Sequence, residues 1–310
     1  PTYRVAKDTI VCLDLKTGKT LWKAESPGEP KGRSCSSTPA VADGFVYAIG
    51  STHLYCVNAK TGEIKWSTAL KRKGASTSPL VIDGVVVVHA DYITAYDTAS
   101  GEEKWSHPKT RVANASPVAW SKDGKTFVIS HDRSALVAYD PQSGEEQWSI
   151  AAGGDSTPAI HGDLLAVQCK NEKLGLIAIK LDIKEPRMLW SHPIVARRSQ
   201  SSPIIHEGNV YLVDSSKAYC IEGKSGKVIY LQTINAAITS PVMADGKVFL
   251  VTDRGNNITM LRPGKEELSE LGKHRIKALS CPSPTVTDGY MIVRQADRLV
   301  AFDLTESQGL

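Results

Sequence analysis

The sequence predicts an all-β chain folded as a β-propeller, and two repeated motifs and their spacing lead to this fold class. The first motif is a strand, a tight Thr-Gly or Ser-Gly turn and a second strand that ends on tryptophan, as in Leu54 to Trp66. The second is a small polar residue followed by proline and a short apolar run, and its seven copies lie 38 to 45 residues apart. Four short antiparallel strands in roughly 40 residues are typical of a propeller blade.

Each unit is predicted to run in the same order. The proline motif begins the first strand, and in most units an Asp-Gly pair soon after it marks the hairpin to the second strand, because Asp-Gly between apolar runs is a strong hairpin signal. A loop leads to the third strand, and the Thr/Ser-Gly turn leads to the fourth. The marker prolines are Pro39, Pro79, Pro117, Pro158, Pro203, Pro241 and Pro284.

The two ends of the chain carry incomplete units. Thr2 to Asp14 predicts a second and a third strand, and Lys19 to Trp22 a fourth. The unit from Pro284 stops after a third strand, Leu299 to Asp303. Because both terminal units contain a third strand, we expect eight blades with incomplete terminal blades. The alternative is seven, with Lys19 to Ala24 closing the last blade. An open sheet edge is a liability, so we expect an upstream segment of the precursor to supply the missing strands.

Composition sets further limits. A closed ring of repeats without a linker predicts a single domain over residues 1–310. The net charge of +4 is too small to predict nucleic-acid binding without a clustered footprint. No apolar run approaches the ~18 residues of a membrane span. The chain has no basic-then-apolar leader, which leaves a cytoplasmic protein or one whose leader has been removed.

The tryptophans are predicted to have a structural role. A large ring at the same place on every outer strand indicates packing between neighbouring blades rather than ligand binding. The residues at this position are Trp22, Trp66, Trp105, Trp148 and Trp190, with Tyr230 and Leu268 in the degenerate units. Trp120 is out of phase, in the hairpin around Asp123, where we expect an exposed ring.

The cysteines and histidines do not predict a metal site. Cys12, Cys56 and Cys220 share a repeat position with alanine, which predicts small, buried, free thiols. Equivalent positions in different blades are too far apart for a disulfide, and no Cys-x-x-Cys spacing supports zinc. The redox compartment stays open. The remaining candidates are His53, His89 and His131, near the loops between second and third strands; no carboxylate spacing supports zinc there.

The phrase Asp/Asn-x-x-Thr/Ser-Gly-x-x-x-Trp resembles the tryptophan-docking repeat of the PQQ-like (quinoprotein) propeller superfamily, from about Val11 to Leu304. In its length and its lack of a second domain the chain is most similar to BamB-like propellers. This resemblance implies a non-catalytic, protein-binding scaffold that is periplasmic or otherwise extracytoplasmic. We expect a monomer with a protein partner, such as an envelope assembly complex. The alternatives are a PQQ-dependent quinoprotein oxidoreductase and an extracytoplasmic sensor module of a larger receptor.

The enzyme alternative makes demands that the sequence does not meet. A quinone cofactor needs an apolar sandwich and a hard cation held by carboxylate and amide oxygens. The chain lacks the adjacent cysteine pair common in quinoprotein alcohol dehydrogenases, and no Asp base pairs with a calcium set in corresponding repeats. Asp155, Asp214 and Asp253 are the nearest candidates, yet carboxylates at strand ends are usually solvated. Hydrolase and phosphate-binding motifs are also absent. We therefore predict no catalytic residues, no PQQ and no calcium.

A charge asymmetry appears when the repeats are aligned. Cations lie about six residues before several marker prolines, in the connectors between the fourth strand of one unit and the first strand of the next. We call this set the basic rim: Arg33, Lys73, Arg111, Arg197, Arg198 and Lys277. Connectors share one face with the loops between second and third strands, whereas the opposite face carries acidic hairpins. A ring of cations attracts anions, so we predict docking of an acidic loop or an anionic small molecule. The alternative is a set of solvated loop side chains.

Overall fold

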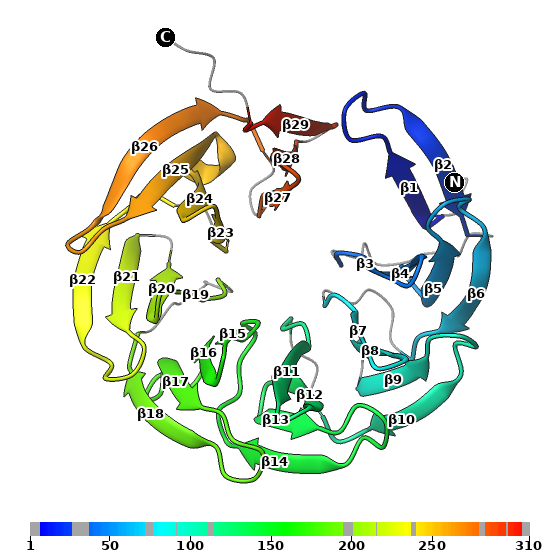
Figure 1. Ribbon diagram of the computed structural model, residues 1–310, viewed down its shortest axis with the longest axis horizontal. Helices are drawn as coiled ribbons and strands as arrows, with labels where there is room; N and C mark the ends of the chain where they lie inside the picture. The colour runs from blue at the N-terminus through cyan, green and yellow to red at the C-terminus, as the bar shows by residue number, and fades with distance from the viewer. Residues whose placement is uncertain are drawn as a thin grey trace, which may run out of the picture. The chain divides into compact units, whose positions relative to one another are not determined.

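The computed structural model describes residues 7–26, 37–71, 77–90, 92–110, 114–194, 201–214, 216–236, 240–278, 283–295 and 297–305. These residues form antiparallel sheets joined by turns, together with one 3₁₀ turn, η1 (Asp253–Gly255) (Figure 1). The chain divides into two compact units. The first comprises Pro1–Thr157 and Ile183–Glu185, and the second Pro158–Asp182 and Pro186–Leu310.

The described part of the first unit contains four sheets. The two-stranded sheet is β1 (Thr9–Leu13) and β2 (Thr20–Glu25). The next sheet is β3 (Ala40–Ala42), β4 (Phe45–Ile49), β5 (His53–Asn58) and β6 (Ile64–Ala69). It is followed by β7 (Leu80–Ile82), β8 (Val85–His89), β9 (Ile93–Asp97) and β10 (Glu103–His107). The last is β11 (Val118–Lys122), β12 (Lys125–His131), β13 (Leu136–Tyr139) and β14 (Glu146–Ile150).

The described part of the second unit also contains four sheets. The first is β15 (Ala159–His161), β16 (Leu164–Gln168), β17 (Leu176–Lys180) and β18 (Arg187–His192). The second is β19 (Ile204–His206), β20 (Asn209–Val213), β21 (Lys217–Glu222) and β22 (Val228–Thr233). The third is β23 (Val242–Ala244), β24 (Lys247–Thr252), β25 (Asn257–Pro263) and β26 (Leu268–Arg275). The three-stranded sheet is β27 (Thr285–Thr287), β28 (Tyr290–Arg294) and β29 (Leu299–Asp303).

The sheets are the blades of a β-propeller. Each four-stranded sheet has its strands side by side in chain order, and every pair is antiparallel, as the repeat predicts. Seven of the sheets in the described residues have three or four strands, which matches the alternative count of seven blades. The prediction of eight blades is not confirmed, because within the described residues β1 and β2 pair only with each other and do not make a full blade.

The Asp-Gly turns have the backbone that their sequence predicts. A positive φ angle is unfavourable for most residues other than glycine. Asp adopts it more readily, because its short polar side chain can hydrogen-bond locally. The φ angles are 50° at Asp43, 46° at Asp83, 49° at Asp123, 47° at Asp245 and 47° at Asp288. Each following glycine also has a positive φ, for example 79° at Gly44. Two successive positive φ angles define the hairpin turn whose twist matches that of the flanking strands.

The strand register places a small side chain opposite each large ring. The pairs are Cys12 with Trp22, Cys56 with Trp66, Ala95 with Trp105, Ala138 with Trp148, Ala178 with Trp190 and Cys220 with Tyr230. The register shifts beside each of these pairs, as at a β-bulge. The shared position of Cys12, Cys56 and Cys220 is therefore confirmed. Each of these thiols is free.

Two predictions about ring positions are wrong. Leu268 pairs with Pro263, and the pair beside the register shift is Met260 with Gly272. The hairpin between β25 and β26 is longer than its equivalents in the other sheets. The position that holds a ring elsewhere is therefore occupied by Gly272. Trp120 is buried rather than exposed, since it lies in β11 and its ring contacts that of Phe127 on β12, 5.3 Å between centroids.

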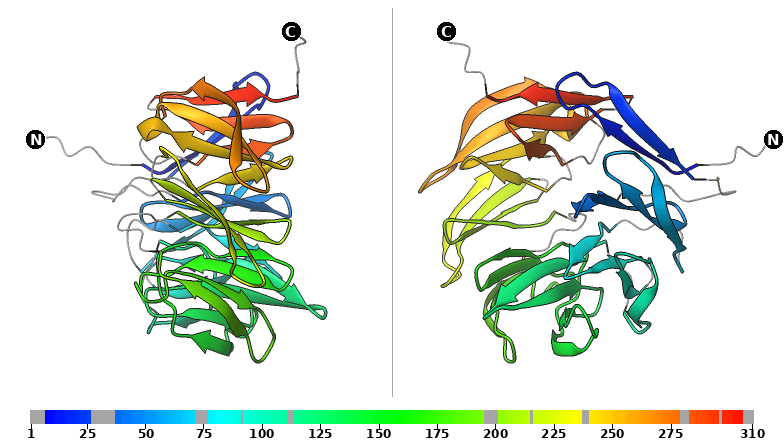
Figure 2. Two further views of the ribbon diagram at one scale, coloured as in Figure 1. Left: turned by 90° about the vertical axis from the view of Figure 1, so that its left-hand side faces the viewer. Right: turned by 45° about the vertical axis from the view of Figure 1, so that its right-hand side comes forward.

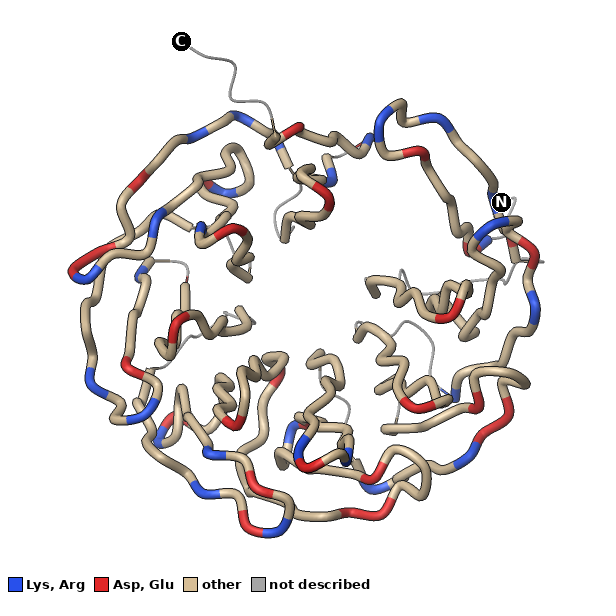
Figure 3. Tube along the Cα trace, in the orientation of Figure 1, with Lys and Arg blue, Asp and Glu red and all other residues tan. Residues whose placement is uncertain are grey.

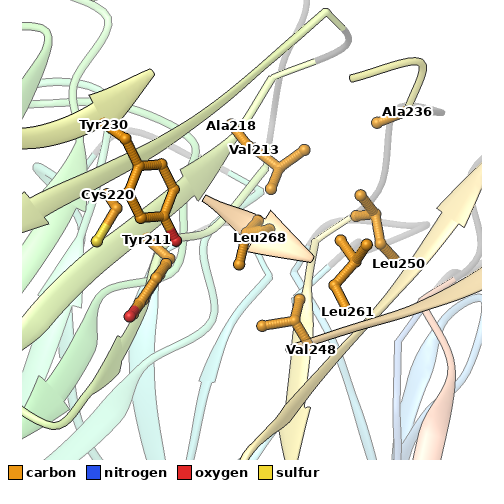
Figure 4. Close-up of a cluster of buried hydrophobic side chains, with 10 residues drawn as sticks. All are labelled: Tyr211, Val213, Ala218, Cys220, Tyr230, Ala236, Val248, Leu250, Leu261 and Leu268. Carbon is orange, nitrogen blue, oxygen red and sulfur yellow. The ribbon is translucent and has the colours of Figure 1, made fainter. Parts of the chain in front are cut away.

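The hydrophobic core lies between neighbouring sheets. In each unit the sheets pack face to face (Figure 2), and each core cluster takes residues from two consecutive sheets. The cluster drawn in Figure 4 joins two sheets of the second unit through Tyr211, Val213, Ala218, Cys220, Tyr230, Ala236, Val248, Leu250, Leu261 and Leu268. Burial between sheets explains the long apolar runs of the second and third strands, such as β8, in which all five residues are buried.

Indole rings join consecutive sheets. Four of the five repeat tryptophans donate Nε1–H to a backbone carbonyl in the turn before the fourth strand of the next sheet. These bonds run from Trp22 to Ala59 at 2.9 Å, Trp66 to Thr98 at 3.0 Å, Trp105 to Pro141 at 2.9 Å and Trp190 to Gly223 at 2.9 Å. Trp148 is buried, and its Nε1 has no hydrogen-bond partner among the described residues. On β2, β6, β10 and β18 the indole thus holds the turn of the neighbouring sheet.

Side chains two residues after the tryptophan extend this contact. Thr68 Oγ1 donates to the Gly101 carbonyl at 2.7 Å, and His107 Nε2 lies 2.7 Å from the Gly144 carbonyl. His192 Nε2 lies at the same distance from the carbonyl of Gly226. Sequence analysis assigned no role to these residues, although the repeated Trp-Ser-His triplet was a visible signal.

The proline motif has a physical basis that the sequence did not reveal. Before five of the seven marker prolines, the preceding residue donates its backbone N–H to the hydroxyl of the equivalent residue in the next sheet. In the first unit these bonds run from Thr38 to Ser78 at 3.0 Å, Ser78 to Ser116 at 2.9 Å and Ser116 to Thr157 at 3.0 Å. In the second unit they run from Ser202 to Ser240 at 3.0 Å and from Ser240 to Ser283 at 3.3 Å. A small hydroxyl residue is therefore required at this position to join the first strands.

Replacing Gly144 by alanine tests the turn-to-indole contact. A Cβ at Gly144 would lie 2.6 Å from the Trp105 ring, and its φ is +72°. Gly84 is the matched control, because its φ is +76° but nothing lies within 4 Å of a Cβ. We expect Gly84→Ala to cost about 1 kcal/mol from the backbone alone. Gly144→Ala should cost about 2 kcal/mol more from overpacking. Equal losses in urea unfolding would contradict the contact.

Candidate functional site

The connectors and the loops between second and third strands lie at one end of each sheet, because its strands alternate in direction. The predicted basic rim lies on these connectors. Arg33, Lys73, Arg111, Arg197 and Arg198 are outside the residues that the structure describes. Their grouping therefore stays a prediction. Of the six rim residues, Lys277 lies in the described part of the chain.

Lys277 is exposed on a connector that is held against its own blade. Its backbone N–H donates to the Asn256 carbonyl at 3.2 Å, and its φ is +49°. The adjacent loop contains Asp253 and Arg254, whose φ angles are +52° and +56°. Consecutive left-handed residues other than glycine are costly and often occur where a loop has a function. Arg254 is also exposed, so this loop and connector present two cations together.

Asp253 organises the polar network beneath that loop. Its carboxylate accepts hydrogen bonds from Lys273 Nζ at 2.6 Å and from Asn235 Nδ2 at 2.9 Å. The hydrogen bond from Lys273, and after it the hydrogen bond from Asn257, hold the pKa of Asp253 below its ordinary value. A cavity of about 510 Å³ adjoins the network, with Thr252 and Asp253 among its lining residues. Because Asp253 is occupied by donors from this chain, it acts as an anchor for the loop.

Two cations that flank the predicted rim are ion-paired. Lys71 Nζ lies 3.1 Å from a Glu103 carboxylate oxygen on β10, and it also lies over the Tyr92 ring. Lys273 pairs with Asp253 as described. Sequence register alone does not reveal such partners, because they come from strands distant in the chain.

His89 and His131 of the first unit lie at the same end but inside the protein. His89 is 1% exposed, and neither ring nitrogen has a hydrogen-bond partner among the described residues. Burial lowers the pKa of His89 to about 4. His131 is fully buried, with Nδ1 2.7 Å from the Ser156 carbonyl and Nε2 2.8 Å from that of Ala152. These contacts hold the connector to β12.

His53 is half-buried, and its Nδ1 lies 2.8 Å from the Thr52 hydroxyl. In the described part of the chain, no three His, Cys, Asp or Glu side chains gather closely enough to hold a metal ion. The carboxylates that the sequence singled out are engaged in the chain itself. Asp214 accepts the backbone N–H groups of Ser216 and Lys217 at 2.9 Å, and Asp155 lies 4.0 Å from Arg133.

A second candidate surface, which sequence analysis missed, lies in the second unit. A cavity of about 830 Å³ opens between β18 and the turn that precedes β22. Among its lining residues are Lys180, Arg187 and Lys224. We call it the β18–β22 cavity. The sequence contains one indication of this surface: the strand after the cavity, Val228–Thr233, has no charged residue.

Comparison with known proteins identifies the family of these blades. The family model described as outer membrane protein assembly factor BamB matches residues 6–155 and 122–267. The chain belongs to the BamB family. The predicted resemblance to a PQQ-like, BamB-like propeller is therefore confirmed.

Relatives of this BamB-family chain include both assembly factors and enzymes. Outer membrane protein assembly factor BamB from Yersinia pestis is 23% identical over 274 residues, which cover 77% of this chain and 66% of that protein. Tetrathionate hydrolase from Acidithiobacillus ferrooxidans is 25% identical over 251 residues, covering 77% and 44%. Methanol dehydrogenase subunit 1 from Paracoccus denitrificans is 29% identical over 124 residues, covering 32% and 20%. The chain thus spans just under two thirds of the Yersinia protein and less of the enzymes.

Solved structures show the same fold. BamB from Moraxella catarrhalis superposes with a TM-score of 0.74 at 15% identity, covering 92% of this chain and 88% of that one. Quinohemoprotein alcohol dehydrogenase from Comamonas testosteroni gives a TM-score of 0.57 at 15% identity, covering 92% and 67%. At these identities the likeness shows the propeller fold alone. Among the residues that the structure describes, no helix is long and apolar enough to span a membrane.

Proposed function

We propose that this BamB-family chain is a non-catalytic protein-binding scaffold that docks an acidic partner or an anionic ligand on the basic rim. Family membership carries the proposal, and a rigid set of blades suits the display of many loops. The exposed pair Arg254 and Lys277 supports a positively charged connector face. By its family the protein acts outside the cytoplasm, in the periplasm, as a monomeric member of an envelope assembly complex.

The proposed scaffold uses neither PQQ nor calcium. The support is that Asp155, Asp214 and Asp253, the carboxylates nearest to a calcium set, all have partners within the chain. An oxidoreductase would need such oxygens free for the cation. Adding PQQ and calcium to the purified protein is expected to leave its absorption spectrum equal to the sum of the components. A new cofactor band, lost after chelation of calcium, would favour the enzyme alternative.

The rim is tested by replacing Arg33, Arg111 and Arg197 together with alanine. We expect capture of envelope proteins by the immobilised chain to weaken by about tenfold or more, because charge at a docking face steers and holds an acidic partner. The salt dependence of capture should fall as well.

The matched control carries the same loss of charge at the opposite end of the sheets. Lys19, Lys60 and Lys125 are all exposed there, and their replacement by alanine should leave capture unchanged. Equal capture and equal salt dependence in the rim variant and the native protein would remove the rim from the proposed function.

A further inference from the structure

Four turns between a third and a fourth strand hold an indole in the same way. Each turn has a carbonyl that accepts the indole N–H of the preceding sheet, and a glycine with a positive φ that faces the ring. A Cβ on this glycine would lie 2.8 Å from Trp22 at Gly62, 2.6 Å from Trp66 at Gly101, 2.6 Å from Trp105 at Gly144 and 2.5 Å from Trp190 at Gly226. The missing side chain of the glycine therefore makes room for the ring.

The turn between β1 and β2 has the same construction. Gly18 has a φ of +68°, and its N–H donates to the Asp14 carbonyl at 2.8 Å, as the Gly62 N–H donates to the Asn58 carbonyl at 2.9 Å. Both the N–H and the hydroxyl of Thr17 donate to the Asp14 carboxylate at 2.7 Å. The turn is therefore formed by its own hydrogen bonds, without a ring against it.

Among the described residues, no ring covers this turn. Gly18 is exposed, and nothing lies within 4 Å of a Cβ built on it. The Leu15 carbonyl corresponds to the Ala59 carbonyl that binds Trp22, yet it accepts no hydrogen bond from the described part of the chain. The β1–β2 turn is thus a preformed indole site that the described residues leave open.

Apolar side chains beside this turn are uncovered as well. Val11 is 42% exposed and Leu13 is 38% exposed. By the register of β1 and β5 they correspond to Tyr55 and Val57, which are 4% and 0% exposed because they pack in one cluster with Trp22. Exposed apolar side chains that lie together mark an interaction surface. By analogy with β5, the cover for this surface is a sheet whose outer strand carries a tryptophan.

The ring for this site cannot come from this chain or from a second copy of it. The sequence has six tryptophans, all six lie in the described residues, and none is exposed. Four of them are bound to turns, and the other two, Trp120 and Trp148, are 3% and 7% exposed. A second copy would have to break one of its own contacts to supply an indole. The ring therefore has to come from a segment outside residues 1–310.

Lys16, in the middle of the turn, restricts the residue that precedes the incoming tryptophan. At the equivalent place Gln142 accepts Lys104 Nζ at 3.1 Å, and Lys104 directly precedes the docked Trp105. Where the turn carries lysine instead, the preceding residue is leucine: Leu21 before the ring at the Lys60 turn, and Leu189 before the ring at the Lys224 turn. The cations of the β1–β2 hairpin are blue in Figure 3. Since like charges repel, Lys16 favours an uncharged residue before the tryptophan.

We propose that the β1–β2 turn and the adjacent face of β1 bind a β-hairpin of a partner protein whose outer strand carries leucine followed by tryptophan. The indole lies against Gly18 and donates its N–H to the Leu15 carbonyl, which gives a buried indole the partner it needs. Apolar side chains of the hairpin cover Val11 and Leu13. The inference goes beyond the proposed function, because the basic rim lies at the other end of the sheets and takes no part.

The probe is a labelled peptide with the sequence of Ile93–His107 and the change Lys104→Leu. In the chain this hairpin covers Val137 and Tyr139, which correspond to the uncovered side chains of β1. Its ends are cyclised, because an isolated hairpin is marginally stable. Binding to the full chain is measured by fluorescence anisotropy. We expect saturable binding that Trp105→Ala in the peptide weakens by about tenfold, and that the peptide with its native Lys104 shows only weakly.

Gly18→Ala is the decisive variant of the chain. The new Cβ would occupy the place of the indole but touch nothing in the chain itself, so peptide binding should weaken by about tenfold or more. Gly44→Ala is the matched control, because Gly44 has a φ of +79° and nothing within 4 Å of a Cβ. This control should bind the peptide as the native chain does. Equal urea stability of the two variants shows that the loss of binding is not a loss of fold.

A second pair of variants tests the apolar face. Val11→Lys should weaken peptide binding by about tenfold, because it places a charge under the hairpin. Val41 is 69% exposed on β3, and Val41→Lys should leave binding unchanged.

Four results would overturn the proposal. They are a lack of saturable binding, equal binding of the Trp105→Ala peptide, undiminished binding by a folded Gly18→Ala variant, and a dimer of the chain in sedimentation that Gly18→Ala dissociates. The last result would assign the site to a second copy. The variant that lacks the rim arginines should still bind the peptide, so failure of the rim and failure of this site are distinguishable.

Discussion

Replacing Trp105 by alanine is expected to lower the free energy of unfolding by about 3–5 kcal/mol, the usual cost of removing a buried large ring. The ring is 9% exposed, contacts Tyr139 and His107, and donates Nε1–H to the Pro141 carbonyl at 2.9 Å. Its loss would leave a cavity between two sheets and free the turn that it holds. Chemical denaturation monitored by circular dichroism measures the effect.

Two variants separate the causes of this loss. Trp105→Phe keeps most of the ring but removes the hydrogen bond, so its cost should be smaller. Trp22 lies on the two-stranded sheet and is half-buried, so Trp22→Ala should also cost less than Trp105→Ala. A Trp105→Ala variant as stable as Trp22→Ala would show that the indole is not a principal contact between blades.

Acid is expected to destabilise the first unit through His89. Burial lowers the pKa of His89 from 6.5 to about 4 in the folded chain, so the folded state holds it neutral. Its stabilising contribution is complete above pH 6.5 and is lost as the pH falls toward 4. This pKa shift corresponds to a loss of about 3 kcal/mol in the free energy of unfolding between pH 6.5 and pH 4. Urea unfolding at a series of pH values between those limits measures it.

His89→Leu is the test variant, because the ring nitrogens have no hydrogen-bond partners among the described residues that would be lost. Its stability should fall less steeply over this pH range than that of the native protein. His161 is exposed, and His161→Gln should keep the native pH dependence. Parallel curves for His89→Leu and the native chain would rule out His89 as the source.

The blade could be predicted because its signals are local. Asp43-Gly44 and its equivalents specify a hairpin through their own φ angles, and strand alternation follows from the side chains beside them. Errors occurred where the local pattern is irregular. The extended β25–β26 hairpin moved the ring position from Leu268 to Gly272, and Trp120 is buried by a partner on the next strand.

The candidate sites were less predictable because charge depends on partners. Lys71 and Lys273 look like free loop cations in the sequence, yet Glu103 and Asp253 pair with them from other strands. Conversely, Lys180 and Arg187 lie in different strands, and only the folded chain brings them into one cavity with Lys224. A sequence records which charges exist, whereas their surroundings decide which are available to a partner.

By itself the sequence determined the repeat, the turns, the strand order and the family, because each depends on residues close together in the chain. Only the tertiary structure decided the relay of hydroxyls before the prolines, the burial of His89 and the uncovered turn at Gly18. Those features arise where segments about 40 residues or more apart pack together. Packing between sheets, unlike the conformation of a turn, is not a property of any single segment.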